Sequence, residues 1–377
     1  MTRMRIPLSA PDVVDDDIAA VVQVLQTPQL SLGPKLLEFE QAIARYVGAS
    51  EAIAVNSGTS GLHLCMRGFG IGEGDEVIVP SFTFIAAANA IRMERATPVF
   101  VDIEPETMNL DPDQVEAAIT SRTRAILVVH TFGRPASIDR LLAIAKRHGL
   151  FVIEDACEAL GAEYRGRRVG GFGDAGVFAF YPNKQITTGE GGMIVTSNEE
   201  FARRARALRN QGRANAGEWL EHAEVGYNYR LSELHCALGL SQLRRVDQIL
   251  ERRAAIAEWY DKELRACDAL WLPSTRMEGC KISWFVYVVR LGPRFTRVDR
   301  DAILHGLAAE GIGCGRYFAP IHLQPAYADL RSAHTWGQLP VTEAFGERCL
   351  ALPLFNRIDQ PTVREVCTRL LAFLHKT

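Results

Sequence analysis

One lysine, Lys184, stands between an apolar and aromatic run at residues 177–181 and a segment rich in threonine and glycine at residues 186–192. Apolar neighbours strip water from a lysine side chain and so disfavour its charged form. The neutral amine is the nucleophile that forms a Schiff base with a carbonyl compound. An isolated lysine after a strand is more often a solvated loop residue, so Lys184 needs a chemical partner before it indicates a site.

A candidate partner lies upstream, where apolar residues 152–153 are followed by Glu154 and Asp155. This pattern predicts a buried strand that presents an acid at its C-terminal end. A Schiff-base lysine and an aspartate for a pyridinium nitrogen are the pair that pyridoxal 5′-phosphate (PLP) requires. An aspartate at a strand end is as often a helix cap or a metal ligand, so the surrounding motifs must decide between these roles.

The elements around these two residues alternate between strand and helix. Apolar runs predict strands at residues 52–55, 76–79, 99–102, 125–130 and 151–154. Helical periodicity falls between them, at residues 59–69, 84–93, 112–119 and 138–148. Such alternation predicts an α/β fold with a mainly parallel sheet covered on both faces. Ligands bind beyond the C-terminal strand ends of such sheets, which is where Asp155 lies.

The rest of the chain predicts a second, smaller domain. A long helix is expected from Ser232 to about residue 265, followed by a strand over residues 283–291 and helices over residues 299–309 and 362–375. The length of 377 residues also favours two domains. We therefore expect a large domain over residues 1–250 and a small α+β domain over residues 251–377.

From about residue 32 to residue 240 the chain resembles the DegT/StrS family of sugar aminotransferases, which are fold-type I PLP enzymes. The resemblance rests on the order and spacing of NSGTSG (56–61), GEGDEVIVP (72–80), FTF (82–84), EDA (154–156), FYPNKQITTGEGG (180–192) and GYNYR (226–230). The last third matches more loosely, through SWF (283–285) and PIHLQP (320–325). The resemblance implies a large PLP-binding domain, with a mainly parallel mixed sheet flanked by helices, and a small C-terminal domain.

A phosphate site is expected where a helix opens directly after the first strand. Free amide groups and the helix dipole favour an anion at such a point, and the resemblance assigns the PLP phosphate to Gly58, Thr59 and Ser60. It also implies that Asn228 reaches the phosphate of the partner subunit. Many relatives carry a phosphate-binding serine five residues before the lysine. Ala179 occupies that position here, which removes one hydrogen bond worth roughly 1 kcal/mol.

The resemblance assigns further roles around the cofactor ring. Lys184 holds PLP as a Schiff base, and Asp155 pairs with the pyridinium nitrogen. Phe84 stacks on the ring, although the sequence pattern alone predicts that Phe84 lies in a helix core. Glu158 stands where many relatives carry Gln or His near the PLP hydroxyl. Two residues of the small C-terminal domain, Tyr317 and His322, are weaker candidates for substrate contacts.

The expected activity is a two-step transfer of an amino group from glutamate to a nucleotide-linked keto sugar, in a homodimer with shared active sites. The ITTGEGG segment resembles relatives that act at C4, so we expect a 4-keto-6-deoxy sugar. One alternative is an enzyme similar to aminohydroxybenzoate synthase. Another is a PLP-dependent sugar dehydratase, although those relatives replace the lysine with histidine. A regulator of the same fold without enzymatic activity is the third alternative.

The net charge and composition of the chain limit the classes of partner that we expect. A net charge of −3 favours neither nucleic acid nor an anionic membrane. No apolar run is long enough to span a bilayer. The eight cysteines form no C-x-x-C pair, which indicates a reducing, cytoplasmic compartment.

The nine histidines show no metal-ligand spacing, so we expect no metal site. The GFGDAG segment (171–176) spells a dinucleotide fingerprint, but it precedes a predicted strand and therefore lacks the required helix.

Overall fold

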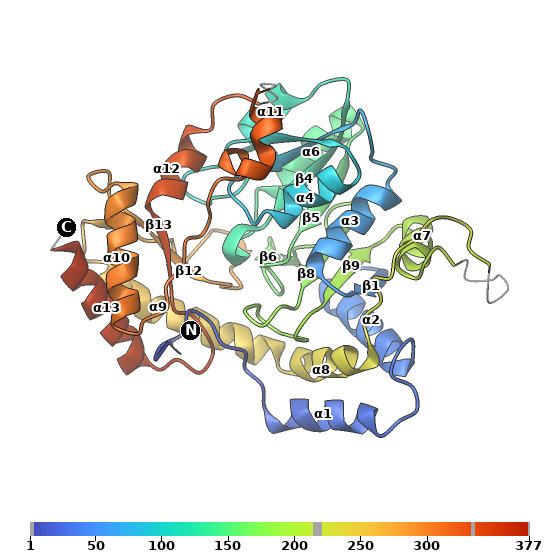
Figure 1. The fold of residues 1–377 in the computed structure, drawn as a ribbon, viewed down its shortest axis with the longest axis horizontal. Coiled ribbons are helices and arrows are strands. Elements are labelled where there is room, and N and C mark those ends of the chain that lie inside the picture. Colours follow the sequence, from blue (N-terminus) through green and yellow to red (C-terminus); the bar gives the residue numbers. More distant parts are fainter. Residues whose placement is uncertain (1–3, 214–220, 333–335, 376–377) are drawn as a thin grey trace.

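The computed structural model describes residues 4–213, 221–332 and 336–375, and a seven-stranded sheet lies at its centre (Figure 1). The strands of this sheet are β1 Glu51–Val55, β2 Glu76–Pro80, β3 Thr97–Val101, β4 Thr123–Val129, β5 Phe151–Asp155, β8 Ala175–Ala179 and β9 Gly192–Thr196. Two three-stranded sheets accompany it: β10 Leu270–Trp271, β12 Tyr287–Leu291 and β13 Cys349–Leu352 form one, and β11 Cys280–Lys281, β6 Glu163–Tyr164 and β7 Arg167–Arg168 form the other.

The central sheet has the order β1-β9-β8-β5-β4-β2-β3. Strands β3, β2, β4, β5 and β8 are parallel to one another, whereas β9 is antiparallel to both β8 and β1. The predicted α/β class with a mainly parallel mixed sheet is confirmed. Because neighbouring parallel strands end at the same edge, the segments that follow β2, β4, β5 and β8 meet there.

Helices cover both faces of this sheet. The α-helices are α1 Asp15–Leu25, α2 Pro34–Val47, α3 Gly58–Gly68, α4 Ala86–Met93, α5 Pro112–Val115, α6 Ile138–His148, α7 Glu199–Arg209, α8 Glu233–Arg244, α9 Val246–Leu264, α10 Arg297–Ala309, α11 Ala328–Ser332, α12 Pro340–Arg348 and α13 Gln360–Leu374.

Side-chain alternation along the strands assigns the helices to the two faces. Val77 and Val79 of β2 pack in one buried cluster with residues of α3, α4 and α7. Ile78, between them, packs with residues of α6 on the opposite face. Since successive side chains of a strand point to opposite faces, β2 is buried on both sides, as a continuous apolar run predicts.

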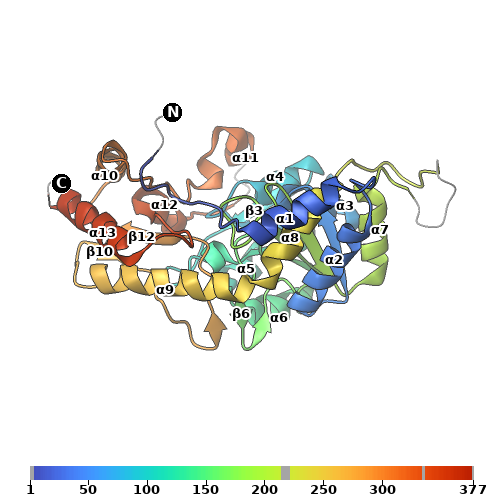
Figure 2. The ribbon, with the colours of Figure 1, turned by 90° about the horizontal axis from the view of Figure 1, so that it is seen from below.

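A separate buried cluster lies in the last third of the chain, between α9, α10, α13 and strands β12 and β13. Helix α9 runs along the molecule and joins the two parts (Figure 2). Its first turns, with Leu250, pack against the central sheet, whereas Ile256 and later residues belong to the second cluster. We propose that two domains meet near residue 250. Ile6 packs in the second cluster, so the N-terminal segment lies against the small domain.

The long helix predicted from Ser232 to about residue 265 is wrong, because two helices occupy this stretch. Helix α8 ends at Arg244 and α9 begins at Val246. Arg245 between them leaves helical geometry, with φ −115° and ψ 15°. Its guanidinium nitrogens Nη1 and Nη2 lie 2.7 Å from Asp12 and 3.1 Å from the buried Asp17. The break between the two helices therefore lies where Arg245 forms ion pairs with the N-terminal segment.

The GFGDAG segment forms a turn that binds a carboxylate of its own chain. The backbone amides of Gly170, Phe172 and Gly173 donate to the Glu154 carboxylate at 2.6–2.7 Å. His130 Nε2 lies 2.9 Å from the same carboxylate. Strand β8 follows the turn, so a strand and not a helix comes after these glycines, as the sequence predicts. Among the described residues, no helix combines the length and the apolar character needed to cross a membrane.

Candidate active site

A cavity of about 500 Å³ opens at the edge of the sheet where the parallel strands end. It is lined by the first turn of α3, by the segments that follow β2, β5 and β8, and by residues 285 and 316–318 from the last third of the chain. Seven of the residues predicted from the sequence line its wall: Gly58, Thr59, Phe84, Asp155, Glu158, Lys184 and Tyr317. The fold therefore brings together segments that are far apart in the sequence.

The first turn of α3 forms one wall. Ser57 is the N-cap of the helix, and its hydroxyl accepts a hydrogen bond from the Ser60 amide at 3.0 Å. The amides of a first helical turn have no acceptor within the helix. An added Cβ at Gly58 would lie 2.8 Å from both Ala179 Cβ and Cys157 Sγ. A glycine is thus required for α3 to begin this close to β8.

Ser60 lies behind this wall and does not line the cavity. It is buried, and its hydroxyl donates to Asn56 Oδ1 at 2.6 Å. Ala179 does line the cavity, in the position where many relatives have serine. Ser57, which belongs to the NSGTSG motif but was assigned no role, lines the cavity and contributes a hydroxyl in place of the missing serine. Its place as the helix cap was the signal that could have identified it.

Lys184 follows β8 and extends into the cavity with 14% of its side chain exposed. Its Nζ lies 3.8 Å from Glu158 Oε1 and 4.1 Å from the centroid of the Phe285 ring. The backbone amide of Lys184 donates to the Tyr181 carbonyl at 2.9 Å, which fixes the turn that carries the side chain. The predicted nucleophile therefore lies between an acid and an aromatic face.

Two further groups suit a flat, aromatic cofactor ring. Phe84 lies between β2 and α4, and 59% of its surface is exposed. The interpretation of Phe84 as a helix-core residue is therefore wrong, because the helix begins only at Ala86. Asp155 ends β5 and is 7% exposed. Burial raises the pKa of Asp155, although the Cys157 amide donates to Oδ1 at 3.1 Å.

Glu158 is the other acid of the cavity. Burial raises its pKa to about 7, even though the nearby Lys184 favours the ionised form. Its Oε2 accepts a hydrogen bond from the Phe132 amide at 2.9 Å. Burial also raises the pKa of Tyr317 to about 12, so its hydroxyl stays protonated at neutral pH. The cavity thus holds an acid that titrates near neutrality beside a hydroxyl that does not.

Two predicted residues lie away from the cavity wall. His322 is buried; its Nδ1 lies 2.8 Å from Ser81 Oγ, and its Nε2 lies 3.2 Å from Glu343. Its placement adds no support for a substrate contact. Asn228 is exposed in a loop, and its carbonyl lies 3.5 Å from Asn56 Nδ2. Within its own chain, Asn228 does not line the cavity.

Sequence reasoning did not assign a role to Phe285 or Arg316. Phe285 belongs to the SWF segment, but nothing in that segment indicates contact with a lysine 101 residues earlier. Arg316 lines the cavity with about half of its side chain exposed, and its Nη2 lies 3.0 Å from Asp301 Oδ2 of α10. In the described part of the chain, no group of three or more His, Cys, Asp or Glu side chains is placed to hold a metal ion.

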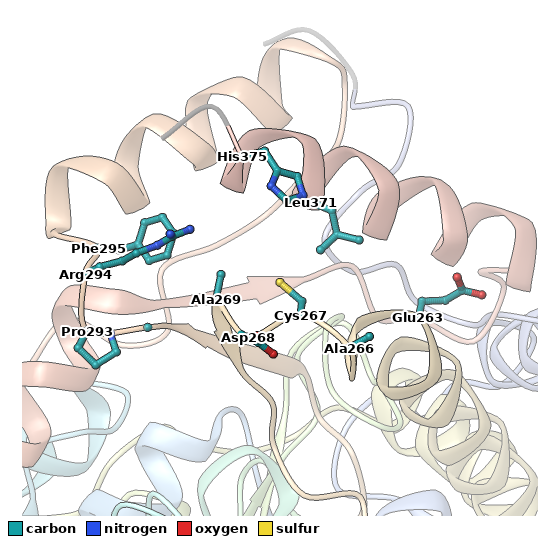
Figure 3. Close-up of a pocket in the computed structure, with 11 residues that line it drawn as sticks. Glu263, Ala266, Cys267, Asp268, Ala269, Pro293, Arg294, Phe295, Leu371 and His375 are labelled. Atoms are coloured by element: carbon teal, nitrogen blue, oxygen red, sulfur yellow. The ribbon is translucent and has the colours of Figure 1, made fainter.

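A second cavity, of about 650 Å³, lies in the small domain between the end of α9, residues 292–295 and α13. Figure 3 shows its lining, with Cys267 and Leu371 on one side and Arg294 and Phe295 on another. None of the predicted site residues belongs to it. It is larger than the first cavity, but the predicted reactive residues line the first one.

The first cavity fits PLP. An amine, a buried carboxylate, an exposed aromatic ring and the first turn of a helix all line the same space. Lys184 would hold the aldehyde carbon, Asp155 the ring nitrogen, Phe84 a ring face, and the first turn of α3 the phosphate.

Comparison with known proteins agrees with this geometry. The DegT/DnrJ/EryC1/StrS aminotransferase family matches residues 11–371. The chain is 42% identical over 369 residues to GDP-perosamine synthase of Caulobacter vibrioides, covering 97% of each chain. A crystal structure of S. venezuelae DesV with a ketimine intermediate is 37% identical, with a TM-score of 0.90 and full coverage of both chains.

Helicobacter pylori PseC, an aminotransferase involved in the biosynthesis of pseudoaminic acid, has a TM-score of 0.94 at 29% identity and covers 99% of this chain and 100% of its own. These likenesses extend over both parts of the molecule and confirm the predicted fold type. The chain belongs to the DegT/DnrJ/EryC1/StrS aminotransferase family and is a PLP-dependent sugar aminotransferase.

Proposed function

We propose that this enzyme moves an amino group from glutamate to a nucleotide-linked 4-keto-6-deoxy sugar. The observation that carries the proposal is the position of Lys184, which lies in a cavity with Asp155, Glu158 and the exposed ring of Phe84. The likeness to GDP-perosamine synthase over 97% of the chain supports a nucleotide-linked acceptor. The ITTGEGG segment after the lysine supports reaction at C4.

Bound PLP supplies the electron sink that stabilises negative charge on the carbon that loses its proton. Lys184 would hold the aldehyde carbon of the cofactor, and its amine, once released, would move the proton of the donor Cα as general base and acid. The Asp155 carboxylate would hold the proton of the ring nitrogen. Phe84 would cover one face of the ring.

The cavity also offers a cation for the substrates, which are both anions. Besides Lys184, Arg316 is the other basic side chain among the cavity-lining residues that the structure describes. Its ion pair with Asp301, at 3.0 Å, orients the guanidinium at the cavity wall. A guanidinium suits a carboxylate or a phosphate, because its donors match two oxygens at once. Arg316 can thus serve each substrate in turn.

The ITTGEGG segment shapes the cavity through its own hydrogen bonds. The Thr187 hydroxyl donates to the Phe180 carbonyl at 3.0 Å and accepts from the Gly189 amide at 2.9 Å. The Thr188 amide donates to the same carbonyl at 2.9 Å. The turn presents Glu190 and Gly191 to the cavity, so residues of this segment are in position to select the sugar.

We also propose that the active unit is a homodimer. Asn228 is exposed and lies outside the cavity of its own chain, as a residue that serves a partner's cavity would be. The tyrosines on either side are held in place: Tyr229 lies 3.1 Å from His63 Nδ1, and the Tyr227 hydroxyl donates to Glu94 at 3.2 Å. Asn228 is therefore presented on a fixed turn.

A panel of acceptors tests the substrate class. The PLP-loaded enzyme and glutamate are offered 4-keto and 3-keto nucleotide sugars, and a cyclic ketone without a sugar, and the position of the new amine is determined by NMR. We expect amination of the 4-keto sugars. Exclusive turnover of the cyclic ketone would favour the function of the aminohydroxybenzoate synthase-like enzymes instead.

A further inference from the structure

A buried histidine of α3, His63, contacts the residues on both sides of Asn228. Its side chain is 3% exposed, and each ring nitrogen has its own partner: Nδ1 lies 3.1 Å from the Tyr229 hydroxyl, and Nε2 lies 2.7 Å from Glu94 Oε1. The same carboxylate oxygen accepts a hydrogen bond from the Tyr227 hydroxyl at 3.2 Å. The imidazole cannot rotate without breaking one of its contacts, so His63 and Glu94 together hold both tyrosines.

The rings of these residues also pack against one another. Tyr227 and Tyr229 are stacked, with ring centroids 4.9 Å apart and an interplanar angle of 11°. The His63 ring meets that of Tyr227 edge-on at 4.8 Å. Both tyrosines therefore point toward α3. Asn228 lies between them and forms an antiparallel bridge with Asn210, so the segment is extended here. Successive side chains of an extended segment point to opposite sides, and the exposed Asn228 thus points away from α3.

The backbone of the same turn is bound to the start of α3. The Asn56 amide donates to the Tyr229 carbonyl at 2.9 Å, and Asn56 Nδ2 donates to the Asn228 carbonyl at 3.5 Å. Asn56 Oδ1 in turn accepts from the Ser60 hydroxyl at 2.6 Å. The start of α3 therefore fixes the backbone of the turn, and His63, in the second turn of the helix, fixes its side chains. One helix thus lines its own cavity and supports a residue that faces away from that cavity.

We infer that His63 is a positioning residue for Asn228 and that it acts on the cavity of the partner subunit, not on the cavity of its own chain. With Glu94 it fixes the turn at residues 227–229, so that the Asn228 side chain is held where it completes the partner's phosphate site. His63 does not line the cavity of its own chain. The inference rests on the proposed homodimer, in which Asn228 serves the partner.

The test titrates the full-length, cofactor-free protein with PLP and follows the absorbance of the Schiff base at Lys184. His63→Leu removes both hydrogen bonds of the imidazole, and Tyr229→Phe removes one of them. Each homodimer should bind PLP about 5- to 10-fold more weakly than the parent, because the turn no longer holds the hydrogen bond of Asn228 to the phosphate. If His63→Leu fails to fold, Tyr229→Phe carries the test.

Tyr260→Phe is the matched control for Tyr229→Phe. It also removes a buried phenol hydroxyl, which donates to the Pro353 carbonyl at 2.7 Å in the second buried cluster. This variant should bind PLP as the parent does, because a loss of stability alone leaves the phosphate site unchanged in the folded protein.

A mixed dimer shows which cavity His63 serves. One chain carries Lys184→Ala and the other His63→Leu or Tyr229→Phe, so the Schiff base forms only in the second chain. The cavity of that chain receives Asn228 from the chain whose His63 and Tyr229 are intact, and we expect it to bind PLP with the affinity of the parent. A local disturbance of α3 would weaken this cavity as much as it weakens the homodimer.

Asn228→Ala, measured in the same way, tests the proposed shared site separately. It should weaken PLP binding in the homodimer and restore it in the mixed dimer. If Asn228→Ala behaves in this way but the His63 and Tyr229 homodimers bind PLP like the parent, or their mixed dimers bind it weakly, the inference on His63 is overturned and the shared site stands. If Asn228→Ala has no effect, or acts within its own chain, the shared site and the inference are both overturned.

Discussion

The side-chain nitrogen of Lys184 lies 3.8 Å from Oε1 of Glu158, and both groups are largely removed from water. Burial raises the pKa of Glu158 to about 7, whereas a carboxyl in the unfolded chain titrates near about 4.3. Between these values the folded protein binds more protons than the unfolded chain. Its stability must therefore fall as the pH rises through this window.

Glu158→Gln removes that dependence, because the amide does not titrate and its oxygen can still accept from the Phe132 amide. Relative to the variant, we expect the parent to lose up to about 3 kcal/mol of unfolding free energy between about pH 4.5 and 8. Denaturant unfolding of the cofactor-free proteins measures it. A variant as sensitive to pH as the parent would mean that Glu158 ionises at a lower pH.

Lys184→Ala should abolish transamination while the fold survives, because the side chain supplies the attachment and the base but little apolar packing. We expect no detectable turnover and a melting temperature within roughly 2–4 °C of the parent. Lys281→Ala, at an exposed lysine of β11, is the control and should retain full activity. Normal turnover by Lys184→Ala would refute the proposed mechanism.

Asp155→Asn tests the partner of the ring nitrogen. The amide keeps the size and the contact with the Cys157 amide, but it carries no charge to hold the pyridinium proton. We expect retention of PLP and a decrease in kcat of roughly 10²-fold or more. Absorbance spectroscopy measures cofactor content, and stopped-flow kinetics measures proton abstraction. An unchanged rate of proton abstraction would remove Asp155 from this role.

The sequence predicted the site best where a motif and a strand end coincide, as at Asp155 and Lys184. The apolar pattern of β5 does not separate its two adjacent acids, and the resemblance through the EDA motif assigned the role to Asp155. Glu154 and Asp155 point to opposite faces because they are neighbours in a strand. Glu154 is bound by the turn at residues 170–173, and Asp155 faces the cavity. The position of that turn, which is a tertiary feature, is the physical reason why Asp155 is the acid that remains available.

Long-range contacts account for what the sequence missed. Phe285 has no local signal, because its contact with Lys184 depends on the packing of the last third of the chain against the segment after β8. The break at Arg245 depends on acids more than 220 residues earlier in the chain. The apolar pattern alone placed Phe84 in a helix core, although the resemblance assigned it to the cofactor ring, because its apolar surroundings conceal that the helix begins two residues later. Each of these features depends on structure that a short stretch of sequence does not reveal.

A mixed dimer tests the shared active site. Lys184→Ala loses the attachment lysine, and Asn228→Trp should block the phosphate site of the partner. In a dimer that combines them, one site carries both changes and the other carries neither, if Asn228 serves the partner. We expect each homodimer to be inactive and the mixed dimer to recover up to about half of the parent activity. Purification through two different affinity tags confirms the mixing.

If both residues act within one chain, each chain of the mixed dimer is damaged once. The mixed dimer would then be as inactive as its parents. That outcome would leave the PLP chemistry intact but would assign Asn228 to its own subunit.

The most direct measurement of the central claim is the balance of products from glutamate and a nucleotide-linked 4-keto-6-deoxy sugar. The enzyme should release 2-oxoglutarate and a 4-amino sugar in equal amounts, with ping-pong kinetics because the amine resides on the enzyme between the two half-reactions. Release of 2-oxoglutarate is measured with a coupled assay, and the amino sugar by mass spectrometry and NMR. Equal amounts of the two products, with the amine at C4, is the predicted result. Turnover of 3-keto sugars alone, or no amination of any nucleotide sugar by the PLP-loaded enzyme, would contradict it.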